Sequence, residues 1–143
     1  MTAWVTFEYA LLRVVPRIER GESINAGVIV HCRARDYLCA KVYLDRARLA
    51  ALDPGADADA VDAALESVAA VSGVPEPPRS DRHATGALSA AGPGAGEDIG
   101  RRFRRLTTAR STIVQPGPVH TGRTRDPAAE TERLLRRLVL PPA

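Results

Sequence analysis

Aromatic residues and lysine are scarce in this chain. Only 4% of its 143 residues are aromatic, so the core must consist mainly of Val, Leu, Ile and Ala, and the stacking platforms typical of single-strand nucleic-acid binders are missing. Lys41 is the one lysine among 20 basic residues. Because this skew accompanies abundant alanine, it indicates a GC-rich genome rather than selection for arginine. Arginine-rich stretches therefore indicate a site only where their geometry supports one.

Long apolar runs and recognised catalytic or metal-binding motifs are also missing. No apolar run approaches the ~20 residues that span a bilayer, and no signal-peptide pattern precedes the first strand-like run. We therefore expect a bacterial-type cytoplasmic protein in which Cys32 and Cys39 remain free thiols. Two cysteines and three scattered histidines do not give a zinc spacing. The sequence contains no P-loop, dinucleotide fingerprint or nucleophile elbow, so no metal or cofactor is predicted.

The overall composition is that of an ordinary globular chain. Hydrophobic residues make up 45% and charged residues 26%, and the length allows one core, so we predict one domain over 1–143. The formal net charge of +3 is too small to indicate nucleic-acid binding by itself.

Three strand-like segments open the chain, at 6–15, 24–32 and 37–44. Their short connections predict an antiparallel meander, and the second is apolar on both faces, which is typical of a central strand. Asn25 and Gly27 interrupt it on what the alternation predicts to be one face. A strand glycine packs no side chain and a buried asparagine needs a partner, so we expect backbone or a ligand to approach closely there.

Helical patterns follow the strands. Capping residues and apolar spacing predict helices at 45–52, 57–73, 97–106 and from 127 onward, opened in three cases by Asp45, Asp57 and Asp126. A strand-like trio at 113–115 and a loop at 116–122 separate the last two helices. The stretch 74–96 is rich in Pro and Gly and predicts a flexible internal linker. The fold class is therefore α+β, with an antiparallel three- to four-stranded sheet packed against helices and a flexible Pro/Gly insertion.

The most site-like stretch runs from Arg101 to Gly122. Arg101, Arg104 and Arg105 can share one helix face, which is either a solvated surface or an anion-binding edge. The next residues offer hydroxyls and another guanidinium that could cradle an anion, although Ser and Thr also end helices. His120 lies in the predicted loop, as a proton carrier, a ligand contact or an ordinary loop residue.

The loop after the first strand is a second candidate, either as a charged surface or as part of a site. We predict that the run 107–120 packs beside this hairpin, close to Arg13 and Asn25. His120 is the candidate catalytic residue, and no other is assigned. The predicted ligand-binding residues are Arg13, Arg17, Asn25, Arg104, Thr107, Arg110, Ser111, Thr112 and His120.

Two runs near the ends of the chain carry a family resemblance. They are YALLRVVPR at 9–17, with ERGE at 19–22 and NAGV at 25–28, and RRLT at 104–107, with RSTIVQP at 110–116 and VHTG at 119–122. Together with the segment 44–54 they resemble a bacterial family known only as domain of unknown function 3037. The chain departs from the usual form in having Arg105 in place of an aromatic residue. The resemblance implies a fold, assigns no catalytic residue, and suggests an accessory role, because such proteins are often encoded beside a kinase-like protein resembling persistence-type toxin kinases.

Three functions remain open at this point. The first is an accessory or binding module that engages a protein partner, such as the kinase-like neighbour, or a small anionic ligand. The second is a small enzyme acting on a phosphorylated or nucleotide-like substrate, with His120 as acid–base and Arg104 and Arg110 stabilising charge. The third is nucleic-acid binding through 101–110, although no helix-turn-helix pattern is evident. The sequence favours the first and leaves open whether the protein is an enzyme at all.

Overall fold

The computed structural model describes residues 3–72, 98–110 and 112–142. The predicted linker at 74–96 and the candidate Ser111 lie outside the described residues. Among the described helices, none combines the length and the apolar character that a bilayer crossing requires.

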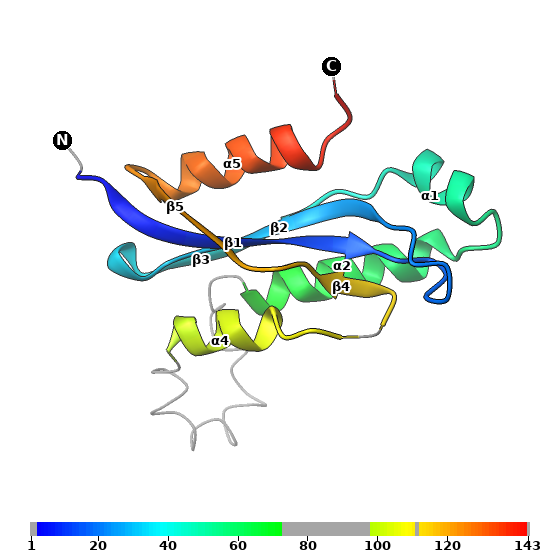
Figure 1. Cartoon of the computed structure of the whole chain (residues 1–143), viewed down its shortest axis with the longest axis horizontal. Helices are drawn as coiled ribbons and strands as arrows, with labels where there is room; N and C mark the ends of the chain where they lie inside the picture. The colour runs from blue at the N-terminus through cyan, green and yellow to red at the C-terminus, as the bar shows by residue number, and fades with distance from the viewer. Residues whose placement is uncertain (1–2, 73–97, 111, 143) are drawn as a thin grey trace, which may run out of the picture.

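The centre of the fold is a five-stranded antiparallel sheet (Figure 1). Strands β1 (Val5–Val14), β2 (Ile24–Cys32) and β3 (Tyr37–Val42) form the predicted meander. The other edge of β1 pairs with two short strands, β4 (Val114–Pro116) and β5 (His120–Thr124). The predicted fold class is confirmed, and the fourth position in the sheet is shared by β4 and β5.

In the described ranges, four α-helices pack on this sheet: α1 (Arg46–Leu52), α2 (Ala58–Ser72), α4 (Ile99–Leu106) and α5 (Pro127–Leu138). A short 3-10 helix, η1 (Arg33–Arg35), joins β2 to β3. The predicted caps are confirmed, because carboxylates of Asp45, Asp57 and Asp126 accept hydrogen bonds from first-turn amides of α1, α2 and α5. The Asp98 carboxylate likewise accepts a hydrogen bond from the Gly100 amide at the start of α4.

The sheet separates two apolar layers. One layer contains α1, α2 and α4, with Leu12, Ile29, Leu65 and Phe103 among its buried residues. The other contains α5, where Leu134 packs with β-strand residues of the opposite face. Figure 1 shows α5 on one side of the sheet and α2 and α4 on the other. Because β-strand side chains alternate between faces, each strand residue belongs to one of these two sides.

Three sequence expectations need correction. The predicted loop at 116–122 is wrong in its second half, where residues from His120 onward form β5. In α2 the apolar residues Val61 and Leu65 are buried, but Val71 is 44% exposed and Ala64 is also exposed. The inner stripe of α2 is therefore narrower than its apolar residues suggest.

The third correction concerns β2. Leu12 pairs with Gly27 and Arg13 pairs with Asn25, so Ala26 is the extra residue of a β-bulge. The bulge places Gly27 and Asn25 on opposite faces rather than on one. Gly27 fits because a Cβ there would lie 2.9 Å from the Lys41 carbonyl oxygen. The expected close approach is therefore backbone, from β3.

Candidate functional site

The two end motifs meet along β1. Arg13 pairs with Gln115 and Tyr9 with His120 across the sheet, and the backbone N–H of Gly117 donates to the Leu11 carbonyl at 2.8 Å. The later motif therefore runs beside the first strand, as predicted. This meeting is made by backbone pairing, so it fixes the strands and does not by itself define a site.

The predicted site residues are divided by the sheet. Arg13, Asn25 and His120 lie on the α5 face, whereas Arg110 and Thr112 line a groove beside α2 and α4 on the opposite face. The structure therefore does not bring these residues into one pocket. Alternation of side chains along β1 is the physical reason, since Arg13 and the groove residue Leu12 are neighbours in sequence.

On the α5 face, each predicted residue has a defined place. The Asn25 amide donates to the Leu138 carbonyl at the end of α5, at 3.0 Å. The Arg13 guanidinium lies over Gly117, where a Cβ would come within 3.1 Å of its Cζ. The exposed ring of His120 lies against Tyr9, with centroids 5.2 Å apart.

Around the end of α4, the predicted hydroxyls are used by the backbone. Thr107 donates to the Phe103 carbonyl at 2.9 Å and Thr108 to the Arg104 carbonyl at 2.8 Å. Arg110 donates to the Arg105 carbonyl at 3.0 Å. These bonds complete the C-terminal turn of the helix. Thr112 in turn donates to the Val114 carbonyl at 2.8 Å, just before β4.

Arg17 lies at the tip of the β1–β2 hairpin, away from the helix end. Its guanidinium is 3.7 Å from the Glu19 carboxylate and 3.6 Å from that of Asp53. The Asp53 contact ties the hairpin to the loop between α1 and α2. Both distances are those of loose ion pairs, which stabilise a surface only slightly.

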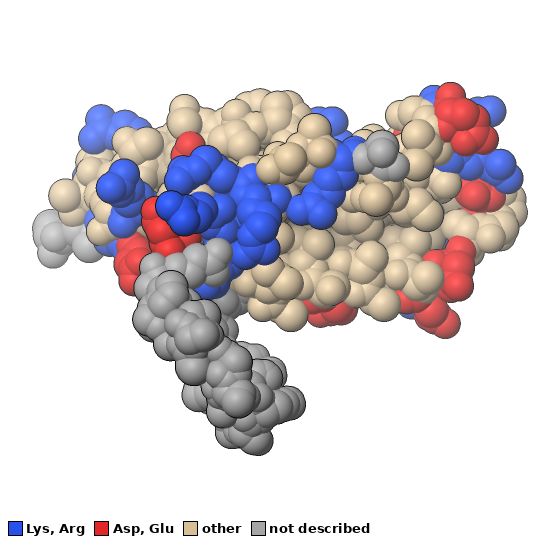
Figure 2. Space-filling view, turned by 90° about the horizontal axis from the view of Figure 1, so that it is seen from below, with Lys and Arg blue, Asp and Glu red and all other residues tan. Residues whose placement is uncertain are grey.

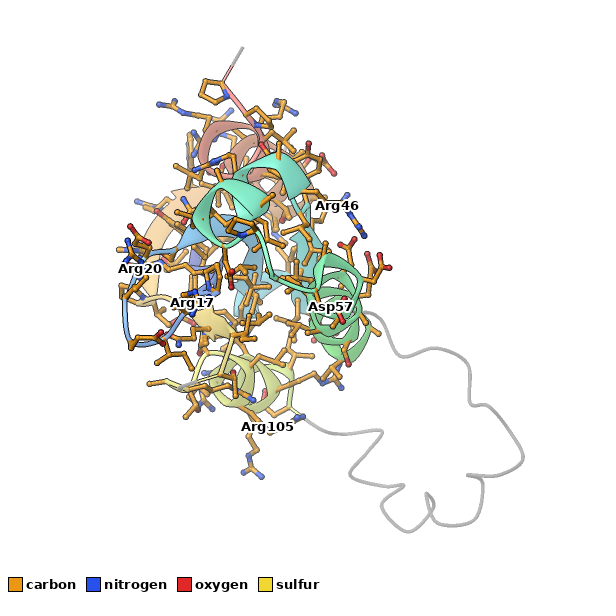
Figure 3. All side chains as sticks on the ribbon, turned by 90° about the vertical axis from the view of Figure 1, so that its right-hand side faces the viewer. Arg17, Arg20, Arg46, Asp57 and Arg105 are labelled. Carbon is orange, nitrogen blue, oxygen red and sulfur yellow. The ribbon has the colours of Figure 1, made fainter. Side chains whose placement is uncertain are left out.

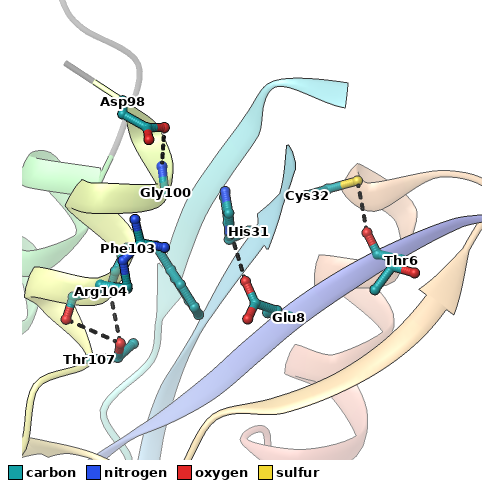
Figure 4. Close-up of polar contacts among 9 residues, drawn as sticks. All are labelled: Thr6, Glu8, His31, Cys32, Asp98, Gly100, Phe103, Arg104 and Thr107. Atoms are coloured by element: carbon teal, nitrogen blue, oxygen red, sulfur yellow. Dashed lines mark hydrogen bonds and ion pairs between the residues drawn. The ribbon is translucent and has the colours of Figure 1, made fainter. Parts of the chain in front are cut away.

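His31 is a buried histidine in a specific environment. His31 is only 5% exposed, its Nδ1 lies 3.0 Å from the Glu8 carboxylate, and its ring stacks on Phe103 with centroids 5.1 Å apart (Figure 4). A Cβ on Gly100 would lie 3.5 Å from the imidazole. Its Nε2 is buried without a hydrogen-bond partner in the described residues. We interpret His31 as a packing residue that locates the start of α4 on β2.

A polar cluster lies under α5, and the sequence did not predict it. Tyr37 contacts the Thr131 hydroxyl at 2.8 Å, and Thr131 donates its proton to the Pro127 carbonyl, so the phenol is the donor. Burial, followed by the nearby Cys39 thiol, raises the pKa of Tyr37 to about 12. Lys41 pairs with Glu132, and this contact raises the pKa of Lys41 and lowers that of Glu132.

An apolar groove lies on the α2 side of the sheet. Its deeper part, about 670 Å³, lies between α2, the α1–α2 loop and the hairpin tip, and a shallower part of about 370 Å³ continues along α2 toward α4. Ala64, Thr112 and Val114 line both parts. Exposed apolar side chains lie along it: Ile18 is 49% exposed, and Ile113 and Val71 are each 44% exposed. No pattern in the sequence predicted this groove, because its lining comes from separate stretches of the chain.

The two ends of the groove differ in charge. Asp53 and Asp57 lie at the deeper end, and Arg105 and Arg110 lie at the end nearer α4. Figure 3 shows Arg17 on the hairpin side and Asp57 at the start of α2, with Arg105 on α4. Figure 2 shows a large patch of basic side chains on this face, with some acidic side chains beside it and others toward the opposite end of the molecule. A segment bound in the groove would therefore meet opposite charges at its two ends.

The described residues contain no group of three or more His, Cys, Asp or Glu side chains placed to hold a metal ion. Within the groove lining, the hydroxyls of Ser67 and Thr112 have no histidine or cysteine beside them. The groove has an apolar floor and charged ends.

The sheet, the two helical layers and the apolar groove define an α+β domain with a surface suited to binding. Residues 9–139 match the model of the DUF3037 family, whose members are proteins of unknown function. The chain belongs to this family. Comparison with curated proteins gave no match, and comparison with solved structures gave none.

Proposed function

We propose that this protein is an accessory module of the bacterial cytoplasm that binds a protein partner in the groove beside α2. The observation that carries the proposal is the groove itself, with three apolar side chains each more than 40% exposed along it. Contiguous exposed apolar surface is uncommon on monomeric proteins and marks sites of interaction. The kinase-like neighbour implied by the family resemblance is the first candidate partner.

Charge at the groove ends indicates what the partner must carry. Arg110 gives one donor to the Arg105 carbonyl, and a guanidinium has five donors. An acidic side chain of the partner can therefore bind beside Arg110, while apolar side chains fill the deeper part between Ala60, Ile113 and Leu49. We expect the partner segment to combine a short apolar run with a carboxylate at the end that meets α4.

The wall formed by α2 offers a matched test. Ala60 and Ala64 line the groove, whereas Ala63 is exposed on the same helix but outside that lining. Ala64→Gln places a longer side chain in the groove without removing a core residue, and Ala63→Gln makes the same chemical change elsewhere. With the purified kinase-like protein as probe, calorimetry should show that Ala64→Gln weakens binding by about tenfold, equivalent to about 1.4 kcal/mol, while Ala63→Gln binds like the unmodified chain.

The charged end has its own control. Arg110→Glu should weaken the complex and reduce its salt dependence, whereas Arg48→Glu, an exposed change on α1, should have little effect. Absence of any complex at micromolar concentration, or equal effects of the Ala63 and Ala64 variants, would overturn the proposal. Equal unfolding free energies of the variants show that they are folded.

A further inference from the structure

Arg13 occupies an unusual position on the α5 face. It is half-buried in the middle of the sheet, between Asn25 on β2 and Gln115 on β4, which are its cross-strand partners. Its guanidinium is seated on Gly117, where any side chain would crowd it. The side chain is therefore placed by the fold rather than extended into solvent.

The surroundings give Arg13 no acceptor. Arg35, which is also half-buried, donates to the carbonyls of Ala3 at 2.7 Å and Arg125 at 2.9 Å. The Arg13 side chain makes no hydrogen bond or ion pair within the part of the chain that the structure describes. The C-terminal end of α5 favours a cation nearby but accepts no bond from it. No Arg13 nitrogen is among the buried unpartnered atoms of the described residues, so the donors of its guanidinium are open to an acceptor that a ligand brings from solvent.

The carboxylates on α5 form ion pairs with residues other than Arg13. On α5, Glu130 pairs with Arg133 and Glu132 pairs with Lys41. The charged residues in the last turn of α5 are both basic, Arg136 and Arg137. The potential around Arg13 is therefore positive, and no side chain recorded on α5 competes for it.

We propose that Arg13 binds the carboxylate group of a small molecule, with the amides of Asn25 and Gln115 on either side. The planar fork of a guanidinium matches a carboxylate with two parallel bonds. The Arg13 guanidinium carries one positive charge and so balances one negative charge. This favours a carboxylate over a doubly charged phosphate. Asn25 uses its amide on Leu138 but has a second N–H, and Gln115 can turn its own amide toward the ligand. This site lies across the sheet from the groove and does not depend on the proposed function.

The test uses the side-chain Nε–H resonance of Arg13 in the full chain. Sodium acetate is titrated against sodium chloride at matched ionic strength, with sodium phosphate as a separate arm. We expect acetate to shift Arg13 and the Gln115 amide saturably, in the millimolar range. Arg13→Lys should weaken acetate binding by about tenfold, because it loses the paired charge-assisted bonds, while Arg48→Lys should leave it unchanged.

Gly117→Ala provides a second variant that keeps the guanidinium. Its Cβ would lie 3.1 Å from the Arg13 Cζ, so the fork must move, and acetate affinity should fall while the unfolding free energy stays close to that of the unmodified chain. Shifts that are linear in salt, tighter binding of phosphate than acetate, or equal shifts at Arg136 would overturn the proposal. Ala64→Gln should not alter acetate binding. The experiment therefore distinguishes failure of the Arg13 site from failure of the proposed groove function.

Discussion

Tyr9 and His120 face each other across β1 and β5, with their ring centroids 5.2 Å apart. Each belongs to one of the two end motifs, so residues more than a hundred positions apart in the chain form one cross-strand pair. Such pairs contribute to sheet stability when the rings are in contact. The two motifs are thus joined across the sheet, while the groove that we propose for a partner is built on the other face.

Gly27 should be intolerant of a side chain. In Gly27→Ala the new Cβ would lie 2.9 Å from the Lys41 carbonyl oxygen and 3.0 Å from a Val42 methyl. Because backbone in the middle of a sheet cannot move aside cheaply, we expect the free energy of unfolding to fall by about 1–3 kcal/mol. Urea denaturation followed by far-UV circular dichroism measures this change.

Gly55→Ala is the matched control for that variant. Gly55 is exposed, and a Cβ there would meet only the Asp53 carboxylate at 3.6 Å. Its stability should stay within about 0.5 kcal/mol of the unmodified chain, or rise slightly because alanine restricts the unfolded state. Equal losses in the two variants would contradict the assigned crowding at β3.

Phe103 should be the main anchor of α4. Its ring is 1% exposed and stacks on His31, and α4 is short, so packing rather than helix propensity stabilises it. Phe103→Ala should lower the free energy of unfolding by about 3–5 kcal/mol. Arg104→Ala, on the exposed side of the same helix, should cost less than about 0.5 kcal/mol. A small effect of Phe103→Ala in urea denaturation would mean that α4 is not part of the cooperative core.

The sequence was informative where local rules act and uninformative where distant segments meet. The strands at β1 to β3 and the Asp caps followed from alternation and from side chains that bond the next turn. Strand β5 reads His-Thr-Gly-Arg-Thr and has no apolar alternation, because it is an edge strand held by backbone pairing to β1. The bulge at Ala26 divided residues that alternation had placed together, and the groove could not be predicted because separate stretches of the chain form it.

Tyr37 should make stability fall at alkaline pH. Its folded pKa is raised to about 12 by burial, above the value of about 10 in an unfolded chain. Between these values the unfolded state loses the phenol proton first, so the native state binds more protons and the free energy of unfolding decreases as pH rises. Below pH 10 both states are protonated and the contribution is fully present. Tyr37→Phe should therefore show a shallower decline between pH 10 and 12.

That comparison isolates the phenol from other alkaline groups. Lys41, whose pKa is raised by Glu132, also loses stabilising charge at high pH, but it is present in both proteins. At neutral pH, Tyr37→Phe should cost about 0.5–1.5 kcal/mol for the lost bond to Thr131. Identical slopes above pH 10 for the two proteins would show that Tyr37 is not held protonated by burial.

Asp126 should stabilise the start of α5 and its connection to β5. Its carboxylate accepts from the amides of Ala128 and Ala129 at 3.1 and 3.2 Å, and its own N–H donates to the Thr124 hydroxyl at 3.0 Å. The cap therefore connects the end of β5 to the first turn of α5. Asp126→Ala should cost about 1 kcal/mol, whereas Asp126→Asn keeps the acceptor and should lose only the favourable charge at the helix start, about 0.3–1 kcal/mol.

The order of these two variants separates capping from charge. If the hydrogen bonds dominate, Asp126→Asn remains close to the unmodified chain in urea denaturation and Asp126→Ala falls below both, at low and at high salt alike. If charge dominates, the two variants lose equally and the difference disappears at high salt, since exposed charges are screened there. The geometry predicts the first order, because two first-turn amides without acceptors cost more than the interaction of one exposed charge with the helix.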